Sequence, residues 1–309
     1  MADSELANPP ELSFADALSA AAEATEETLR ALLPKGEGGA GEAELCASMA
    51  HATLGGGKRL RAFLVIEATR LCGGPETGAL RAAAALECLH SYSLVHDDMP
   101  CMDDDDLRRG QPTVHKKWNE ATAVLCGDAL QALAFEILAD PATHGSGAVR
   151  AQLCLRLAQA SGAAGMVGGQ ALDLGAETAH APLDGAGVKR LQALKTGALI
   201  EVAAEMGALL AEASPEDVRR LRAYAQALGE AFQIADDLLD VTGTEAETGK
   251  RVGKDASAGK ATFVDILGID GARARATELA ETAATELDPF GPAAEQLAAA
   301  ARFVVARRR

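Results

Sequence analysis

The sequence predicts an all-α protein, and three observations lead to this prediction. Apolar residues recur at intervals of three and four residues almost everywhere, which is the period of an amphipathic helix. The alternating pattern of β-strands is scarce. Apolar residues make up 48% of the chain and aromatic residues only 3%, and alanine and leucine dominate. Such a composition is typical of a large helical core packed with small side chains.

Glycine and proline divide the chain into the predicted helices. About ten to twelve helices fit between these breaks, none of which is long and polar enough to be a domain linker. We therefore expect a single domain over residues 1–309, made of mostly antiparallel helices around a central core or cavity. The breaks lie at 33–41, 72–78, 140–147, 180–187, 213–217, 241–255 and 288–292.

Charge and cysteine content exclude several classes of protein. A net charge of -16 lacks the basic footprint of nucleic-acid binding. Six scattered cysteines without a CxxC pair predict reduced thiols rather than a disulfide framework or a zinc site. The N-terminal residues lack the apolar segment of a signal peptide, and no uninterrupted apolar run reaches the ~18 residues of a spanning helix. We expect a cytoplasmic protein with no membrane span and no nucleic-acid partner.

Six aspartates lie within the ten residues from Asp97 to Asp106, directly after a predicted helix over about 79–98. On that helix His90 and Asp97 are seven residues apart and share one stripe, about 10 Å apart at 1.5 Å per residue. A lone histidine on an apolar stripe is more often a buried core residue. Here the stripe ends in carboxylates, which favours a side chain that faces a cavity.

A second acidic segment lies at 228–243 and has a helical pattern. Asp236 and Asp240 are four residues apart and share a helix face, with Asp237 at its edge and Gln233 near the same line. Clustered carboxylates raise at least one pKa unless a cation compensates. Oxygen ligands at this density suit Mg²⁺ or Mn²⁺. The alternative is a solvated acidic helix face, and the apolar surroundings of the cluster count against it.

Two acidic segments with basic residues nearby indicate one kind of chemistry. Carboxylates on two helices around a cavity could hold several Mg²⁺ ions, and these ions could hold a diphosphate and stabilise its charge as it leaves. Arg108 and Arg109 follow the first segment directly. They either balance its charge or bind phosphate oxygens, which fit the arginine fork.

The chain resembles the trans-isoprenyl diphosphate synthase family, in particular its bacterial farnesyl diphosphate synthases. DDMPCMD at 97–103 is similar to the family's first aspartate-rich motif in its DDxxxxD form, and DDLLD at 236–240 is similar to the second. The resemblance runs in the family's order from about Leu54 to Val264. Other similar segments are GGGKRLR (55–61), LHSYSLVHDD (89–98), DDLRRGQPT (105–113), GGQALDL (168–174), KTGALI (195–200), GEAFQIADD (229–237) and GKRVGKDASAGKATFV (249–264).

The resemblance implies the isoprenoid synthase fold, with helices around a deep central cavity, and a homodimer. It implies a Mg²⁺-dependent head-to-tail condensation of isopentenyl diphosphate with dimethylallyl or geranyl diphosphate, giving mainly farnesyl diphosphate through an allylic cation. The departing diphosphate is the expected base, and water must be excluded because it would quench the cation. Several Mg²⁺ ions, with Mn²⁺ as an alternative, would be bound by Asp97, Asp98, Asp103, Asp236, Asp237 and Asp240.

The resemblance also assigns catalytic and substrate-binding residues. The positions for isopentenyl diphosphate match Lys58, Arg61, His90 and Arg109. The positions for the allylic diphosphate match Arg108, Lys195, Thr196, Gln233, Lys250 and Lys260. Catalysis would depend on Asp97, Asp98, Asp103, Arg108, Lys195 and Asp236.

Several of these residues also have ordinary structural interpretations. Lys195 interrupts an apolar stripe, so it either extends outward along the surface or reaches into a cavity. Lys250 and Lys260 lie in a glycine-rich stretch, which is typical of a solvated loop or of a flap that closes over substrate. The glycines before Gln170 and Asp173 indicate close helix packing, which makes these two residues secondary candidates.

Bulky residues just before the first motif limit product growth in the family, and here these positions are Tyr92 and Ser93. Tyr92 together with the insertion Met99–Pro100 resembles the bacterial farnesyl-forming type. An ideal helix, however, places Ser93 rather than Tyr92 on the face of Asp97, and a geranylgeranyl product is the alternative. His96 points about 100° away from Asp97 and is not a candidate.

Pro100 leads to a specific structural prediction. In a regular helix, Asp103 would lie about 240° round the wheel from Asp97. Because proline disrupts a helix, we expect a kink or bulge near Met99–Pro100 that turns Asp103 back toward the metals. The remaining aspartates, 104–106, would be supporting or solvent-exposed.

Three other functions compete with a synthase. A metal-dependent phosphohydrolase is suggested by HDD at 96–98, but the other histidines lack a recognisable ligand spacing. A terpene cyclase shares a DDxxD motif, but the complete second motif and the basic residues of the isopentenyl site favour chain elongation. A non-catalytic subunit of a heteromer is the third alternative; the intact motifs argue against it, and an assay of the isolated chain decides.

Overall fold

The computed structural model describes residues 12–177, 183–242 and 262–306. Within these ranges the chain is helical apart from turns and one two-stranded antiparallel ribbon, β1 (Leu107–Arg108) with β2 (Gln111–Pro112). The all-α prediction is confirmed. The described helices divide into two compact units, which are described separately. The single domain with a central cavity stays a prediction.

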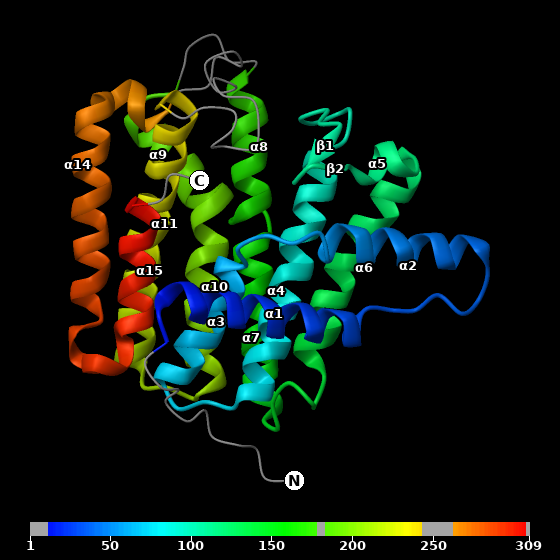
Figure 1. Ribbon diagram of the computed structural model, residues 1–309, viewed down its shortest axis with the longest axis horizontal. Helices are drawn as coiled ribbons and strands as arrows, with labels where there is room; N and C mark the ends of the chain where they lie inside the picture. The colour runs from blue at the N-terminus through cyan, green and yellow to red at the C-terminus, as the bar shows by residue number, and fades with distance from the viewer. Residues whose placement is uncertain (1–11, 178–182, 243–261, 307–309) are drawn as a thin grey trace. The chain divides into compact units, whose positions relative to one another are not determined.

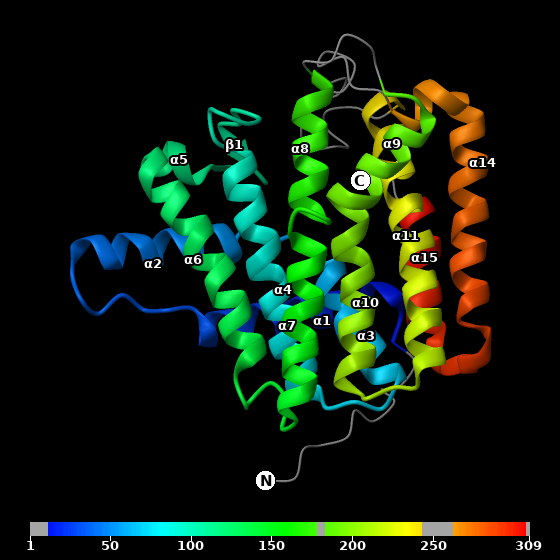
Figure 2. The same ribbon diagram turned by 180° about the vertical axis from the view of Figure 1, so that it is seen from behind.

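The first unit comprises the described residues up to Leu155, together with Leu209–Glu212. Its central helix is α4 (Glu76–Asp97), which packs against four other helices and lies alongside α6 in both views (Figures 1 and 2). Four consecutive alanines, 82–85, are fully buried in α4 and let its neighbours approach closely. The other elements of this unit are α1 (Phe14–Leu32), α2 (Ala40–Thr53), α3 (Leu60–Leu71), α5 (Val114–Lys117), α6 (Glu120–Ala139) and the first part of α7 (Gly147–Ser161).

A buried ion pair fixes the connection between α2 and α3. Arg59 has a left-handed backbone (φ 50°) just before α3, and its guanidinium bonds the carbonyl of Thr53 at the end of α2. Its Nη1 also lies 2.7 Å from the carboxylate of Glu87 on α4, and both side chains are almost completely buried. Because breaking one half of such a pair leaves a buried charge, this contact holds the segment that carries Lys58 and Arg61 in one position.

The helix α6 is long and apolar enough to cross a membrane by length and composition alone, with a mean hydropathy of 1.5 over its window. It is the one such helix in the described part of the chain, and 39% of that window is buried within the structure. Asp128 and Glu136 interrupt its apolar sequence. Val124 and Leu125 on its outer face are 40% and 56% exposed, so this face has no cover within the chain as described.

The second unit comprises Arg156–Ala208 and the described residues from Ala213 onward. Its longest helix, α11 (Pro215–Thr242), packs along α14 (Phe263–Glu286) and α15, and the Tyr224 hydroxyl donates a 2.8 Å hydrogen bond to the Leu297 carbonyl. Thr262 and Asp265 form a capping box at the start of α14. The other elements are the rest of α7, α8 (Met166–Glu177), α9 (Gly185–Gln192), η1 (Ala193–Gly197), most of α10 (Ala198–Leu210), η2 (Asp288–Ala294) and α15 (Glu295–Ala306).

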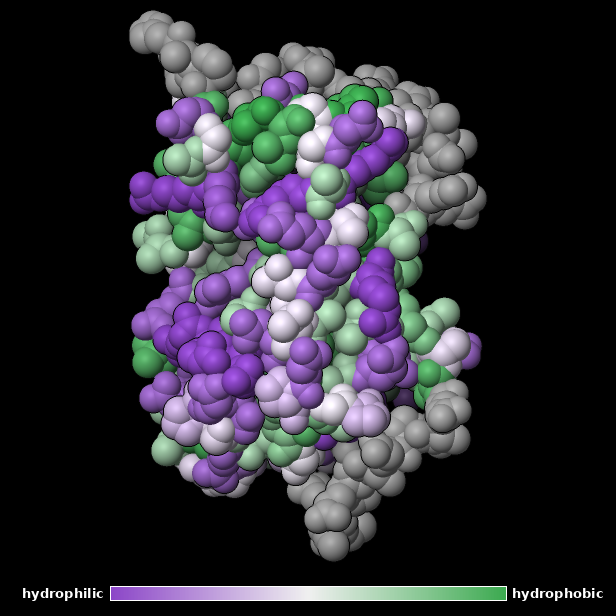
Figure 3. Space-filling model, turned by 90° about the vertical axis from the view of Figure 1, so that its left-hand side faces the viewer, coloured by the Kyte–Doolittle hydropathy of each residue, from purple (hydrophilic) through white to green (hydrophobic). Residues whose placement is uncertain are grey.

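The outer surface of α14 is visible in Figure 3 and is largely hydrophilic. An exception lies near the start of the helix, where Ile266, Leu267 and Ile269 are 45%, 42% and 37% exposed. Gly268, between them, has a φ of 69° and interrupts the helical backbone. Isolated exposed apolar residues are common in soluble proteins, and this small group gives α14 no second buried face.

Candidate active site

The first acidic segment begins where α4 ends. Asp97 is the last residue of the helix and Asp98 follows it as the C-cap. The chain then turns, and the Asp103 amide donates a 2.8 Å hydrogen bond to the Asp97 carbonyl. The helix is therefore interrupted as predicted, but it ends at Asp97, two residues before Met99, rather than bending at a kink. The turn returns the backbone of Asp103 to the side of Asp97.

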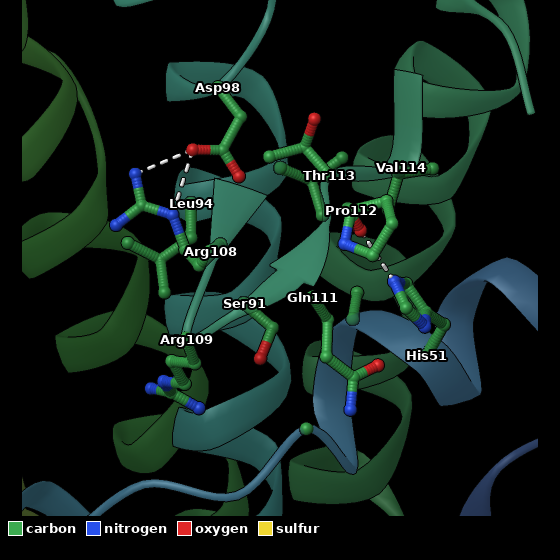
Figure 4. A pocket seen from close by; sticks show the side chains of 13 residues that line it. His51, Ser91, Leu94, Asp98, Arg108, Arg109, Gln111, Pro112, Thr113 and Val114 are labelled. Atoms are coloured by element: carbon green, nitrogen blue, oxygen red, sulfur yellow. Dashed lines mark hydrogen bonds and ion pairs between the residues drawn. The ribbon is translucent and has the colours of Figure 1, made fainter. Parts of the chain in front are cut away.

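Asp98 and Arg108 form the central contact of this segment (Figure 4). Asp98 is 4% exposed, and its Oδ1 accepts hydrogen bonds from Arg108 Nε at 2.7 Å and Nη2 at 2.5 Å. Burial raises the pKa of the Asp98 carboxyl; Arg108 opposes this, and the neighbouring charges of Asp105 and Asp103 add to it. Arg108 thus does not fully offset the effect of burial on this carboxyl.

Arg108 and Arg109 line the same open pocket, together with residues of α2, α4 and the ribbon. The Arg109 guanidinium lies against Gly57, where an added Cβ would come within 2.8 Å of Arg109 Cζ, and it donates a hydrogen bond to the Gly56 carbonyl. Gly57 also has a φ of 119°, which side chains rarely adopt. The glycines of the GGG segment therefore leave room for the Arg109 guanidinium and hold it in place.

Arg61 and His90 lie together on facing helices of the first unit. Arg61 Nη1 donates to His90 Nε2 at 3.4 Å, which requires the imidazole to be neutral. Burial lowers the pKa of His90 well below its ordinary value, and the charges of Arg61, Arg109 and Arg108 lower it further. The structure thus brings three of the predicted isopentenyl residues near one another, whereas Lys58 is an exposed residue just before α3.

The three remaining aspartates of the run differ from Asp98 in burial. Asp106 is exposed and pairs with Lys116 at 2.8 Å, and Asp105 lies 3.8 Å from Arg108. Carboxylates of Asp104 and Asp106 lie within 4.8 Å of a ring nitrogen of the buried His115, a proximity that the sequence did not indicate. These contacts fit the supporting role that was expected for residues 104–106.

The second acidic segment lies inside the continuous helix α11, in the second unit. Asp236 and Asp240 are partly exposed and one helical turn apart, as predicted, whereas Asp237 is 2% exposed. Asp237 Oδ1 accepts a 3.2 Å hydrogen bond from Gln233 Nε2, and its Oδ2 accepts the Phe263 amide at 2.9 Å. Asp237 therefore already joins α11 to the start of α14.

Lys195 and Thr196 lie on η1, a five-residue π-helix that the sequence did not predict. Lys195 Nζ is 2.6 Å from Asp173 Oδ2 on α8. The backbone of η1 touches two glycines: a Cβ on Gly169 would lie 2.3 Å from Lys195 N, and one on Gly229 would lie 3.2 Å from Gly197 Cα. Such single-turn π-segments are frequent at functional sites, and here two glycines make room for one.

The predicted allylic residues of the second unit that the structure describes line one open pocket. Lys195, Thr196 and Gln233 all reach it, and so does Asp173, which the sequence placed only as a secondary candidate. The glycines before Asp173 pack closely, as expected: Gly169 leaves room for the backbone of Lys195, whose ammonium contacts Asp173. Gln170 lies one turn before Asp173, and its buried amide atoms have no hydrogen-bond partner among the described residues. Lys250 and Lys260 lie outside the described residues.

The predicted chain-length residues differ in their surroundings. Tyr92 is buried, at 6% exposure, and its ring meets the ring of His96 one turn further along α4. Ser93 is partly exposed, and its hydroxyl donates a 2.8 Å hydrogen bond to the His90 carbonyl. The helix wheel correctly separates the two residues onto different faces of α4.

An all-helical fold with two aspartate-rich segments and clustered arginine and lysine defines a class of diphosphate-binding enzymes, and comparison with known proteins specifies it. The polyprenyl synthetase family model matches residues 42–289. Farnesyl diphosphate synthase of Escherichia coli is 51% identical over 243 residues, which cover 78% of this chain and 80% of that protein.

Two solved structures extend the likeness to the whole fold. An apo FPP/GFPP synthase from Zymomonas mobilis is 46% identical with a TM-score of 0.86, over 95% of this chain and 99% of that one. A geranyltransferase from Helicobacter pylori, complexed with magnesium and isoprenyl diphosphate, is 32% identical with a TM-score of 0.81, over 96% and 98%. The chain belongs to the polyprenyl synthetase family and is a short-chain trans-prenyltransferase, as the sequence predicted.

Proposed function

We propose that this prenyltransferase condenses isopentenyl diphosphate with dimethylallyl and then geranyl diphosphate to give mainly farnesyl diphosphate. The observation that carries this proposal is the pocket of the second unit, which gathers Lys195, Thr196 and Gln233, the last from the helix α11 that also carries the second acidic segment. A lysine, a hydroxyl and an amide together offer donors to a diphosphate, and neighbouring carboxylates offer ligands to its cations.

The donors fit Mg²⁺, with Mn²⁺ as the alternative. The proposed ligands are six carboxylates without cysteine or histidine, and hard oxygen donors of this kind suit these two ions. Asp97, Asp98 and Asp103 would hold them in the first unit, and Asp236, Asp237 and Asp240 in the second. The bound ions supply the positive charge that stabilises a leaving diphosphate. That both segments serve the same diphosphate is part of the proposal.

The chain's own residues have separate roles in this reaction. Arg108, held by Asp98, and Lys195, held by Asp173, are positively charged groups with fixed positions that attract the allylic diphosphate. Arg61, Arg109 and the neutral His90 form a second donor group for isopentenyl diphosphate, whose charge the two arginines balance. Lys58, Lys250 and Lys260 would add donors around these diphosphates.

Product chromatography tests the proposal. Purified protein is incubated with Mg²⁺, isopentenyl diphosphate and either dimethylallyl or geranyl diphosphate, and the products are separated by chain length. We expect a fifteen-carbon main product from both starters, and loss of product with EDTA that Mg²⁺ restores, with Mn²⁺ tested in parallel. A twenty-carbon main product would identify a geranylgeranyl synthase instead.

The same assay decides between the other functions. Phosphate or diphosphate released without condensation would indicate a phosphohydrolase, and a cyclic hydrocarbon would indicate a cyclase. No product from the isolated chain, when a related enzyme is active under the same conditions, would indicate a non-catalytic subunit.

We further propose a cytoplasmic homodimer, in which the two units of each chain form one domain. One family model spans both units, which supports a single domain. The apolar outer face of α6, with Val124 and Leu125 exposed, is a surface that a second copy of the chain would bury. Leu125→Glu should convert a dimer to a monomer in analytical ultracentrifugation. A wild-type monomer at micromolar concentration, or recovery of the protein in the membrane fraction, would contradict this.

A further inference from the structure

Tyr92 is held in place from α6, the helix alongside α4. Its ring meets the ring of His96 edge to face, with centroids 5.6 Å apart and an interplanar angle of 87°. Burial raises the pKa of Tyr92, and the side chain of Gln131 on α6 opposes this. The ring is thus held at its edge by His96.

His96 is in turn anchored to α6. Its Nε2 donates a 3.2 Å hydrogen bond to the Val124 carbonyl, which can only accept, so this nitrogen carries the proton. The ring lies directly over Gly127, where an added Cβ would come within 2.1 Å of Nε2. Gly127 and the Val124 carbonyl of α6 therefore hold the imidazole that contacts Tyr92.

We propose that His96 is a positioning residue for product length, because it fixes the ring of Tyr92 that stops the growing chain. This inference rests on the proposed function and on the expectation, from the family resemblance, that Tyr92 limits the product to fifteen carbons. The Tyr92 side chain can block growth of the product only if it does not move aside. An edge-to-face aromatic pair favours one ring orientation over others by an amount that corresponds to about tenfold in population at most. Without His96, Tyr92 would keep its size but could adopt other rotamers, which would leave room for a longer product.

The first experiment compares Tyr92→Ala with His96→Ala by product chromatography with geranyl diphosphate as the starter. Tyr92→Ala should give products of twenty carbons or more. His96→Ala should raise the twenty-carbon fraction about tenfold, although Tyr92 is still present. The double variant should give the same products as Tyr92→Ala alone, because His96 acts only through the Tyr92 ring.

Two further variants separate positioning from a general loss of structure. His96→Phe keeps a ring against Tyr92 but removes the bond to Val124, and we expect it to retain mainly farnesyl product. Gly127→Ala forces the His96 ring out of its seat and should lengthen products as His96→Ala does. Gly41→Ala is its matched control, since the added Cβ on α2 meets nothing within 4 Å. Thermal unfolding of each variant confirms that it is folded.

The outcomes distinguish the two levels of the argument. If Tyr92→Ala lengthens the product but His96→Ala and Gly127→Ala keep the wild-type distribution, the role of His96 is wrong and the proposed function stands. If Tyr92→Ala itself leaves the product unchanged, the chain-length role of Tyr92 fails. A fall in turnover of His96→Ala with no change in product distribution would mean that His96 only supports the neighbouring Asp97.

Discussion

The two acidic segments present similar carboxylates on two different kinds of backbone. In the second unit, Asp236 and Asp240 lie one turn apart within the continuous helix α11. In the first unit, α4 ends at Asp97, and a hydrogen bond from the Asp103 amide to the Asp97 carbonyl closes a turn of seven residues. Helical periodicity thus spaces the carboxylates in α11, whereas a specific turn does so after α4.

The comparison shows that the number of residues between two aspartates does not by itself determine whether their side chains lie on the same side. A helix repeats every 3.6 residues, so a carboxylate four residues on returns to the same face. A carboxylate six residues on does not, and it needs Pro100 to prevent the helix from continuing. Arg108 then holds Asp98 just beyond the helix end, where no further helical turn supports it.

Removing one carboxylate from each segment is the strongest test of their equivalence. Asp98→Asn and Asp236→Asn should each lower kcat by about 10³-fold or more, because each removes charge that stabilises the leaving diphosphate. Asp104→Asn, in an exposed part of the same turn, is the control and should stay within about twofold. Steady-state kinetics with saturating Mg²⁺ measures this. Near-normal turnover of Asp236→Asn would refute the assignment of the second segment.

Deletions in the turn after α4 test whether a continuous helix, as in α11, can replace it. Deleting Met99 and Pro100 together places Asp103 four residues after Asp97, so a longer α4 would present it as α11 presents Asp240. This variant should keep kcat within about tenfold of the wild type. Deleting Met99 alone would place Asp103 five residues after Asp97, about 140° away from it around a helix, and should lower kcat more than about 100-fold. Equal losses in the two variants would show that the turn itself, rather than the direction of the carboxylate, is required.

Filling the space beside η1 tests the second unit alone. Gly169→Ala would place a Cβ 2.3 Å from Lys195 N and so displace the π-helix. We expect KM for the allylic diphosphate to rise about tenfold, with overpacking that costs about 1–3 kcal/mol of stability. Gly175→Ala on the same helix α8 meets nothing within 4 Å and is the matched control. If both variants have the same KM, the close contact between Gly169 and η1 does not position Lys195.

The smallest expected effect concerns the positive charge around the first segment. The folded-state pKa of His90 is held well below that of the unfolded chain, about 6.5, so below this pH the unfolded state binds a proton that the folded state does not. Stability therefore falls as the pH drops from 7.5 to 5.5, by about 1 kcal/mol from this group. Urea unfolding of the wild type and of His90→Gln should show this difference, and parallel pH profiles would contradict it.

The regular parts of the molecule could be predicted from the sequence. The all-helical class, the face shared by Asp236 and Asp240, and the interruption near Pro100 all follow from periodicity and from the chemistry of proline. The ribbon at 107–112 and η1 could not, because a two-residue strand and a π-turn have no period. The seats at Gly57, Gly127 and Gly169 also depend on tertiary contacts, which one sequence does not display.

His96 shows a second limit of helix-wheel reasoning. The wheel correctly turns it away from Asp97, and it was therefore excluded as a site residue. What the wheel does not contain is the partner helix, on which Gly127 leaves room for the imidazole and Val124 offers a carbonyl. A residue that points away from the chemistry can still orient the side chain that bounds it.

Asp237 makes the start of α14 a reporter of the second acidic segment. One carboxylate oxygen of Asp237 accepts a hydrogen bond from the Phe263 amide. A ligand that draws the carboxylate away would break this bond and speed hydrogen exchange of the amide. A ligand that strengthens the bond would slow that exchange. The exchange rate of a single backbone amide, followed by isotope labelling, thereby records occupancy without turnover. It does so in variants too slow to assay, which gives inactive forms of the enzyme a measurable binding state.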